Sequence, residues 1–324
     1  MRVGCINYAT EQGLGILARS FYRAGVVTDF MIVQHSRPTH PEWYPEGTPV
    51  VDVRRDQGRM RDFCRGLDAL LILETPFDWG LVEYCRHIGV RTVLMPMYEC
   101  MPRRLPARPD EIVNPSLLDQ RYYPDGVFLP VPVDSDLVPY RRRERAEVFV
   151  HNAGHGGLKG RNGTAEVLEA VQHLKSMARI LIRTQDPLGG VQTGRIEVRS
   201  GTIPYDLLWT EGDVFLFPEK FNGLSLPLQE ARASGMLVMC GDRFPMNTWL
   251  PRGPLIPLKG YRSESVSPRC NLFEEAIIEP RAIAARIDEW YGRDISAYSE
   301  SAVEWRNEMS WERLRPRYME VIEG

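Results

Sequence analysis

The sequence has little that would place the chain outside the ordinary class of globular proteins. Charge of one sign is not in excess, because 40 Lys and Arg residues stand against 43 Asp and Glu residues for a formal net charge of -3. The total therefore indicates neither nucleic acid nor an anionic membrane as a partner, although a local basic patch is still allowed.

Long apolar runs are also missing. No stretch approaches the roughly 20 residues that a membrane-spanning helix needs. The first six residues, MRVGCI, carry one positive charge and too short an apolar run for a secretory signal. We therefore expect a cytoplasmic protein with no integral membrane segment.

Cysteine pairs of the C-x-x-C type are absent, and four of the six cysteines lie inside apolar segments. This pattern favours reduced, buried thiols over disulfides or a metal site. A 43% hydrophobic content in 324 residues still supplies a large core, and the length predicts about two domains.

Short apolar runs alternate with amphipathic stretches, a pattern typical of βαβ units in a mainly parallel sheet. The first half predicts strands at 1–7, 28–34, 68–73, 91–96, 111–114 and 126–131, and helices at 14–24 and 78–88. The second half predicts strands at 147–152, 178–183, 196–200, 213–218 and 237–240, and helices at 164–175, 205–211, 226–234, 280–291 and 297–324. The proline-rich segment 129–134 and the charged run 141–145 indicate a domain boundary between the two halves. We predict an α/β protein in which ligands bind beyond the carboxyl ends of the strands.

Two glycine-containing loops follow predicted strands. In the loop 7–15, Gly13 and Gly15 would let a ligand approach the backbone at a helix N-terminus, although a simple tight turn explains them equally well. It is not the G-x-G-x-x-G fingerprint, so NAD is not supported. The loop 151–164 holds five glycines, and its amides together with Lys159 and Arg161 could bind phosphate.

The second loop has two other interpretations. It is not a Walker A loop, because the Lys-Ser/Thr pair is missing. Its histidines, His151 and His155, invite a metal site but lack a nearby carboxylate or cysteine as third ligand, so we expect no metal. The remaining alternative is a long flexible loop without a ligand.

A third segment, 213–235, reads as a buried strand, a turn with exposed amides, and a helix. Pro227 suits the first turn of that helix and Gly235 suits its C-terminal end. Glu230 lies one turn into the helix. Taken alone, it would be a solvated residue or one that interacts with the helix dipole.

This segment resembles the donor-binding region of GT-B glycosyltransferases of the retaining, Glu-x7-Glu type (family-4-like, glycosyl transferases group 1). The family pattern is roughly D-V-F-V-x-P-S-x-x-E-G-F-G-L-P-x-L-E-A-M-A-x-G, and the matching positions are 213–218, Gly223, Leu226, Pro227, Glu230, Ala231, Ala233 and Gly235. Three stretches fall in the family's order: 129–134 resembles its I-P-N-G-V-D, 149–160 its F-V-G-R-x-x-x-x-K-G loop, and 310–321 its F-S-W-E-x-x-x-x-x-Y-x-x-V helix. Motifs cover about 125–324, and residues 1–125 resemble the family only by architecture.

The resemblance implies two Rossmann-like domains facing each other across a cleft. It divides the chain into an acceptor-side domain at 1–135, a nucleotide-sugar donor domain at 136–300, and a C-terminal helix at 301–324 that packs back toward the first domain. It implies that Glu230 holds the nucleotide ribose. The other expected donor contacts are Gly13, Gly15, Gly154, His155, Gly156, Asn222, Gly223, Leu224 and Ser225.

The chain departs from the family at one acidic position. The family's first Glu falls on Asn222, eight residues before Glu230, and Glu219 lies three residues too early. Asparagine can still donate and accept hydrogen bonds to sugar hydroxyls, but without charge. The family's first Glu addresses the donor sugar, so this departure bears on which sugar is bound.

The implied reaction is transfer of a sugar from a UDP- or GDP-sugar to an acceptor hydroxyl. The nucleotide sugar is a co-substrate, and neither a cofactor nor a metal is expected. Lys159 and Arg161 would stabilise the departing diphosphate by charge. Retention of configuration is implied, with the leaving phosphate taking the acceptor proton, so no carboxylate nucleophile of the glycosidase type is required.

Two carboxylates in the first half each follow a predicted buried strand. Glu74 and Glu99 would therefore lie where the sheet's ligands bind, and they could orient or deprotonate an acceptor hydroxyl. A helix N-cap or a salt bridge is the alternative role for each of them.

Two other functions stay open. A phage-type transferase acting on a modified DNA base would use local arginines and aromatics to bind a flipped base; the residues in question are Arg103, Arg104, Arg108, Arg141, Arg142, Arg143, Arg145, Trp79, Tyr122 and Tyr123. A nucleotide-sugar-binding protein with a degenerate active site would explain the missing first Glu. The acceptor could be a glycan, a small molecule or a modified base.

Overall fold

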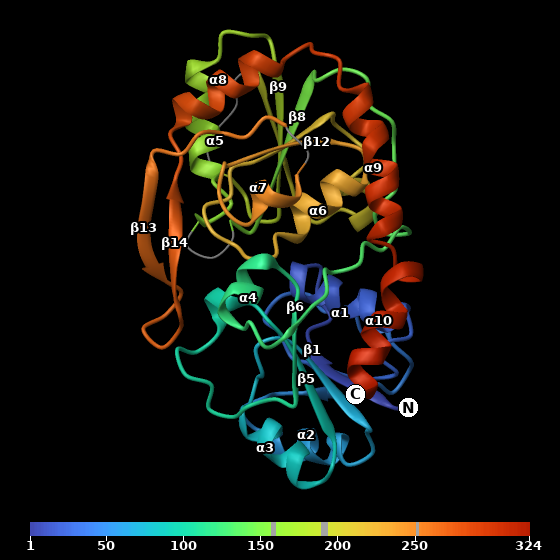
Figure 1. Ribbon diagram of the computed structural model, residues 1–324. Coiled ribbons are helices and arrows are strands. Elements are labelled where there is room, and N and C mark those ends of the chain that lie inside the picture. Colours follow the sequence, from blue (N-terminus) through green and yellow to red (C-terminus); the bar gives the residue numbers. More distant parts are fainter. Residues whose placement is uncertain (157–159, 189–193, 251–252) are drawn as a thin grey trace. The chain divides into compact units, whose positions relative to one another are not determined.

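A computed structural model of the 324-residue chain describes residues 1–156, 160–188, 194–250 and 253–324. The chain forms two compact units (Figure 1). Unit 1 comprises Met1–Pro132, Ser267–Asn271 and Trp311–Gly324, and unit 2 comprises Val133–Val266 and Leu272–Ser310. The chain thus passes between the units four times. The sequence predicts only two such passages, one at the domain boundary and one before the C-terminal helix.

Unit 1 is built on a parallel sheet of seven strands in the order β3-β2-β1-β4-β5-β6-β7. Its strands are β1 (Val3–Asn7), β2 (Asp29–Val33), β3 (Val50–Val51), β4 (Ala69–Glu74), β5 (Arg91–Pro96), β6 (Glu111–Asn114) and β7 (Val127–Phe128). Its helices are α1 (Gly13–Arg23), α2 (Gln57–Cys64), α3 (Gly80–His87), α4 (Leu117–Tyr122) and α10 (Trp311–Glu323). The central strands are continuous apolar runs because both faces are covered.

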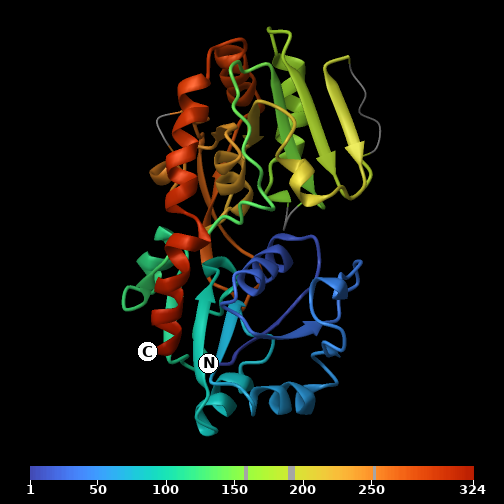
Figure 2. The same cartoon turned by 90° about the vertical axis from the view of Figure 1, so that its right-hand side faces the viewer.

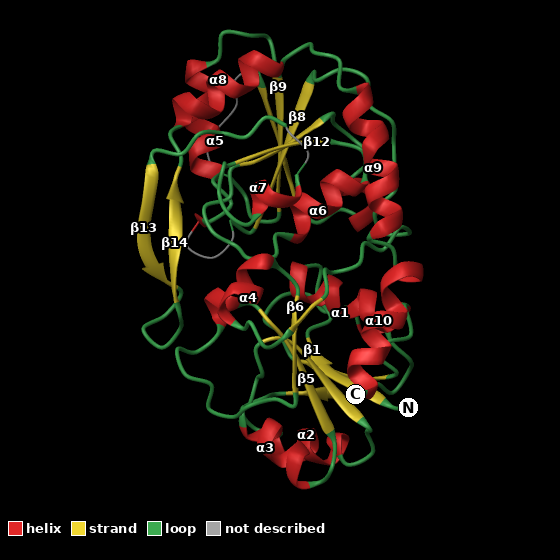
Figure 3. Ribbon diagram, in the orientation of Figure 1, coloured by secondary structure: helices red, strands yellow, loops and turns green. Residues whose placement is uncertain are grey.

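Unit 2 has a parallel sheet of five strands in the order β10-β9-β8-β11-β12, shown in yellow in Figure 3, and a separate antiparallel hairpin. The strands are β8 (Val148–Gly154), β9 (Arg179–Thr184), β10 (Ile196–Ser200), β11 (Val214–Phe217) and β12 (Leu237–Cys240), and the hairpin pairs β13 (Gly260–Ser265) with β14 (Leu272–Ile277). The helices are α5 (Thr164–Ala170), α6 (Leu226–Ala233), α7 (Met246–Trp249), α8 (Pro280–Trp290) and α9 (Ser296–Glu308).

The core of unit 2 has a layer on each face of its sheet. On one face, α5 and α8 pack on the strands through residues such as Val167, Ile283 and Ile180. On the other face, α6 and α9 pack through residues such as Leu228 and Trp305 (Figure 1). Both sheets therefore have the doubly wound order, in which the chain reverses beside the first strand of each unit and leaves a ligand-binding crevice there.

The sequence predicts a helical segment at 297–324 with a kink or a division into two pieces at Pro316, and the structure differs from this. The segment forms α9 and α10, and the break lies at residues 309–310 rather than at Pro316, which is inside α10. Helix α10 packs within unit 1, where the Trp311 indole donates to Ser20 Oγ at 2.8 Å and the Tyr318 hydroxyl donates to the Pro130 carbonyl at 3.0 Å. Figure 2 shows the two helices following one another along the chain.

Two expectations from composition can be compared with the structure. All six cysteines are free, and Cys5, Cys64, Cys85 and Cys240 are buried. Within the described ranges, no helix combines the length and apolarity that crossing a membrane requires.

Candidate functional site

The carboxyl ends of β8 and β11 bring the two conspicuous loops of unit 2 together. These strands are neighbours, with Val214 opposite Phe149 and Phe215 opposite Val150. Parallel neighbours end at the same edge of a sheet, so the glycine loop after β8 meets the turn after β11. The amide of Lys220 donates to the Arg161 carbonyl at 2.7 Å, which joins the two loops directly.

His151 on β8 is a structural residue rather than a ligand. Its ring is fully buried, with Nδ1 2.9 Å from the Leu216 carbonyl and Nε2 2.9 Å from Thr164 Oγ1. Burial lowers the pKa of His151 to about 4. The neutral ring therefore donates from Nδ1 and accepts at Nε2, and it joins β11 to the start of α5.

Four glycines in the described part of the glycine loop have a left-handed backbone. Gly154, Gly156, Gly160 and Gly163 all have positive φ, which favours glycine. At Gly163, a Cβ would lie 2.4 Å from the Pro218 carbonyl oxygen, so this close approach excludes any side chain. His155 is exposed, and Lys159 lies outside the described residues.

Arg161 is held between the two loops. Its side chain is 20% exposed, and Nε lies 3.9 Å from Glu219 Oε1. Its guanidinium also lies over the Phe221 ring, 5.8 Å from the centroid. The charge predicted to bind phosphate is therefore partly buried beside an aromatic ring and a carboxylate.

The turn between β11 and α6 encloses a buried polar network that the sequence did not predict. The Glu219 carboxylate accepts from Asn222 Nδ2 at 2.9 Å and from Ser225 Oγ at 2.6 Å. Arg243, which follows β12, lies 3.4 Å from Glu219 Oε2 and donates to the carbonyls of Glu219 and Asn222 at 3.0 Å each. The turn is thus held in place by hydrogen bonds among its own side chains and by Arg243, which follows the neighbouring strand β12.

Asn222 serves the turn through both ends of its amide. Its Oδ1 accepts from the amides of Leu224 and Ser225 at 2.9 and 3.0 Å, and its Nδ2 donates to Glu219. Ser225 has a left-handed backbone at φ 46, which a non-glycine residue adopts at a cost. In this structure the predicted donor contacts at 222, 224 and 225 are engaged with one another, and their role toward a donor sugar stays a prediction.

Glu230 lies in the middle of α6 with a buried carboxyl group, unlike the solvated residue that the helix alone suggested. Its side chain accepts from the Tyr205 hydroxyl at 2.7 Å, and the residue is 7% exposed. Burial raises the pKa of Glu230 to about 8; the Tyr205 hydrogen bond opposes this rise, and the negative charge of Asp134 adds to it. Burial thus favours the protonated form of this carboxyl.

The described residues contain no group of three or more His, Cys, Asp or Glu placed to hold a metal ion. The sequence carries one Asp-x-Asp triplet, Asp134-Ser135-Asp136, in addition to the two histidines considered above. There, Asp134 Oδ1 accepts from the Asp136 amide at 3.0 Å, which makes a local turn.

Unit 1 places its two predicted carboxylates at the ends of adjacent strands. Glu74 is the last residue of β4 and has a positive φ of 70, and its carbonyl accepts from the Met97 amide at 3.1 Å. Glu99 follows β5 in a short 3-10 helix, Tyr98–Cys100, and is 1% exposed. Gly15 instead fits the tight-turn interpretation, since a Cβ there would lie 2.2 Å from the Thr10 carbonyl oxygen.

A second buried carboxyl in unit 1 escaped the sequence analysis. Asp119 in α4 is 1% exposed and accepts from the Tyr98 amide at 2.9 Å. Burial raises its pKa to about 7, the Ser116 hydroxyl opposes this rise, and the charge of Glu99 adds to it. Only the Ser-x-x-Asp spacing of an N-cap would have pointed to this residue.

The arginine run 141–145 is partly buried and partly exposed. Arg143 is 2% exposed, and its guanidinium donates to the backbone carbonyls of Trp209, Gly212 and Ser234. Arg141, Arg142 and Arg145 are exposed, and Arg142 pairs with Glu144 and with Glu300. Arg143 therefore supports the fold of unit 2, and the nucleic-acid interpretation of the exposed arginines stays a prediction.

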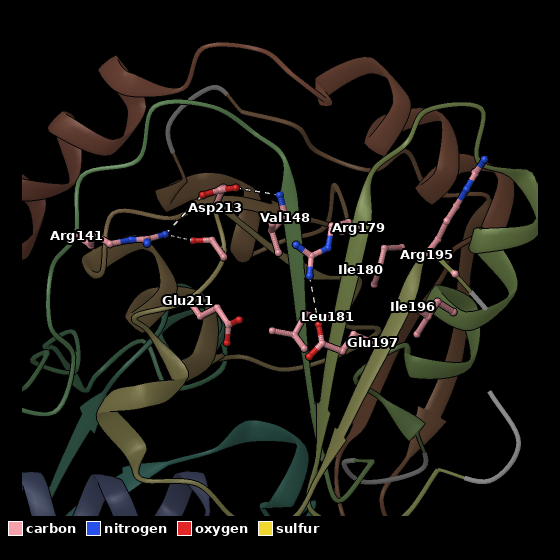
Figure 4. Close-up of a pocket in the computed structure, with 12 residues that line it drawn as sticks. Arg141, Val148, Arg179, Ile180, Leu181, Arg195, Ile196, Glu197, Glu211 and Asp213 are labelled. Carbon is pink, nitrogen blue, oxygen red and sulfur yellow. Dashed lines mark hydrogen bonds and ion pairs between the residues drawn. The ribbon is translucent and has the colours of Figure 1, made fainter. Parts of the chain in front are cut away.

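A cavity of about 400 Å³ in unit 2 lies away from this site (Figure 4). Its lining includes Val148, Arg179, Ile196 and Asp213, which lie at the amino ends of the strands. Arg179 pairs with Glu197 at 3.4 Å there. The described residues that line it include Arg141 of the DNA-binding alternative but none of the residues predicted to bind the donor or the acceptor.

Comparison with solved structures identifies the class of fold. HepE of Anabaena in complex with UDP matches with a TM-score of 0.66 at 10% identity, covering 100% of both chains. A glycosyltransferase from Rickettsia africae ESF-5 matches at 0.64 and 11%, covering 100% of this chain and 99% of that one. Sucrose-phosphate synthase from Thermosynechococcus elongatus matches at 0.65 and 10%, covering 100% and 98%.

These structures are GT-B glycosyltransferases, and this chain has their fold, with two Rossmann-like domains. The fold-class prediction is confirmed. No family model matches the sequence, and no curated protein matches it.

Proposed function

We propose that this protein is a glycosyltransferase that uses a nucleoside-diphosphate sugar as donor. The observation that carries the proposal is Glu230, a buried carboxyl in the middle of α6, the helix that follows β11, where it accepts a hydrogen bond from the Tyr205 hydroxyl. HepE, which has the same fold, is described in complexes with UDP and with UDP-glucose. We therefore favour UDP-sugars, with GDP-sugars as the second donor class.

In the proposed mechanism, the protein stabilises the diphosphate as it leaves the anomeric carbon. Arg161 supplies a cation from a partly buried position, where charge interacts more strongly than in water. Gly154 and Gly160 have positive φ, a conformation used in anion-binding loops elsewhere, and we assign the backbone amides of this loop to the diphosphate. Lys159 is assigned to the same task from the sequence alone.

We further propose retention of the anomeric configuration and independence from divalent metal. The leaving phosphate would take the acceptor proton, so no carboxylate nucleophile is needed. On the acceptor side we assign Glu74 and Glu99, which end β4 and follow β5, to hydroxyl binding or proton transfer. The class of acceptor is not specified by these residues.

The first experiment is a thermal-shift screen of UDP-, GDP- and ADP-sugars with and without EDTA. A ligand at 100 times its dissociation constant stabilises the folded protein by about 2.7 kcal/mol, which is easily seen. Slow hydrolysis of the stabilising donor, followed by NMR, then gives the anomer released. If none of these nucleotides stabilises the protein, the proposed function is wrong; if one stabilises it without turnover, the protein is a binding protein.

A further inference from the structure

Glu219 is a buried carboxylate of unit 2, three residues before the position where the family carries its first Glu. It is 2% exposed, and its side chain contacts Asn222 and Ser225 in the same turn, Arg243 after β12 and Arg161 in the glycine loop. Asn222 occupies the family position and donates to Glu219 at 2.9 Å. The negative charge is therefore carried by Glu219, whereas the family carries it at the position of Asn222.

The network draws on three neighbouring strands. Arg161 follows β8, Glu219 follows β11, and Arg243 follows β12, and these strands lie side by side in the sheet. Such a charge cluster is weak evidence for stability, because desolvation of buried ions offsets their attraction. What the cluster does fix is geometry, since each contact restrains a different part of the loops.

The two carboxylate oxygens of Glu219 have different partners. Oε1 receives Asn222 Nδ2 and lies 3.9 Å from Arg161 Nε. Oε2 receives Ser225 Oγ at 2.6 Å, which secures the residue with the left-handed backbone at the start of α6. One carboxylate thus links the cation of the glycine loop to the turn that leads to Glu230.

We propose that Glu219 is a positioning residue for donor binding: held by the 222–225 turn, its carboxylate keeps the Arg161 guanidinium in the arrangement that receives the nucleoside diphosphate. Glu219 does not touch the donor itself. Arg243 keeps the carboxylate in place through its contacts with the carbonyls at both ends of the turn. The inference rests on the proposed function, because it deepens the role of the same site.

The test is a double-mutant cycle read by UDP affinity in isothermal titration calorimetry. Glu219→Gln should weaken UDP binding about tenfold, the size expected for losing one charge-assisted hydrogen bond. In an Arg161→Ala background the same substitution should have little further effect, because the residue through which Glu219 acts is gone. A role in folding alone would weaken binding equally in both backgrounds.

Glu219→Gln leaves Arg243 without its carboxylate, so a milder variant accompanies it. Ser225→Ala removes the 2.6 Å hydrogen bond and leaves no charge unpaired. It should weaken UDP binding severalfold in the wild-type background and hardly at all with Arg161→Ala. The melting temperature of each variant shows whether its fold is intact.

Glu211→Gln is the matched control. Glu211 also pairs with two arginines, Arg183 at 3.1 Å and Arg199 at 2.5 Å, but it lines the cavity at the amino ends of the strands. UDP affinity should be unchanged in this variant. A loss equal to that of Glu219→Gln would show a general effect of removing a paired carboxylate and would overturn the proposal.

The outcomes separate the two proposals. If wild-type protein binds UDP but the cycle is additive, or Ser225→Ala with an intact fold binds UDP normally, the positioning role is wrong and the proposed function stands. If wild-type protein binds none of UDP, GDP and ADP, both are wrong.

Discussion

Replacing Glu230 with glutamine should separate the stability of unit 2 from its affinity for a nucleotide. The pKa of Glu230 rises from 4.5 to about 8, chiefly through burial, against the effect of the Tyr205 hydrogen bond and with that of Asp134. Glutamine has the shape of the protonated acid and can still accept from Tyr205. It removes the titration and leaves the packing in place.

The sign of the stability effect follows from proton binding. Between pH 4.5 and 8 the folded state holds a proton that the unfolded state has released, so stability falls as pH rises. Each unit of pKa corresponds to about 1.4 kcal/mol, so the loss over the whole range is on the order of 5 kcal/mol. Glu230→Gln should escape this loss and become more stable relative to wild type by about 1.4 kcal/mol per pH unit.

Nucleotide binding should change in the opposite sense. Ribose hydroxyls donate more strongly to an ionised carboxylate than to a protonated one, so UDP binding at pH 7 should release a proton from Glu230. Affinity for UDP should then rise with pH until about 8, and Glu230→Gln should bind more weakly without that rise. The variant also controls for the titration of the UDP phosphate.

The assays are urea unfolding at pH 5, 6, 7 and 8, and calorimetric titration with UDP in buffers of different ionisation enthalpy. The difference between the two proteins isolates Glu230, because every other titrating group is common to both. A difference in unfolding free energy that stays flat over this range would refute the buried, protonated carboxyl. Equal proton release by both proteins would refute its contact with the nucleotide.

Three further predictions concern other residues and the metal. Arg143→Ala should lower the free energy of unfolding by about 3 kcal/mol or more, because it leaves buried carbonyls without donors; a urea midpoint close to that of wild type would contradict this. The pKa of His151 is lowered to about 4 by burial, so its contribution to stability should be lost as pH falls from 6.5 toward 4, and its ring protons should show no NMR titration above pH 5.5. Donor turnover should survive EDTA, and activity that disappears and returns with Mg²⁺ or Mn²⁺ would overturn metal independence.

Most of the parallel strands could be predicted, and the central ones among them are short apolar runs buried on both faces, whereas the two-residue edge strand β3 was missed. The predicted strands 91–96, 111–114, 196–200 and 237–240 coincide with β5, β6, β10 and β12. The hairpin β13–β14 was missed because its strands mix charged and apolar residues, and both show exposed positions. Helix α2 was missed because only Met60 and Cys64 of its eight residues are buried, which leaves little apolar periodicity.

The positions of the candidate site residues could be predicted from the sequence, but their burial and their contacts could not. Motif spacing located Glu230 and Arg161, but burial depends on residues far along the chain, such as Tyr205 beside Glu230. The role of Glu219 depends on Arg243, which is 24 residues away and reaches it only because β11 and β12 are neighbours. An acid directly after a buried strand was the one local signal for it.

The two buried carboxyl groups of the candidate site, Glu219 and Glu230, differ in what compensates for their removal from water. Glu219 faces guanidinium groups and hydrogen-bond donors from its own unit, so its surroundings are complete before any ligand arrives. Glu230 has the Tyr205 phenol and a raised pKa, so its ionised form needs donors from outside. A group whose partners are all internal can only hold structure, whereas a group that gains partners on ionisation can respond to a ligand. This contrast supports the positioning role that we propose for Glu219 and the binding role that we propose for Glu230, although only Glu230 lies at a position where the family carries an acid.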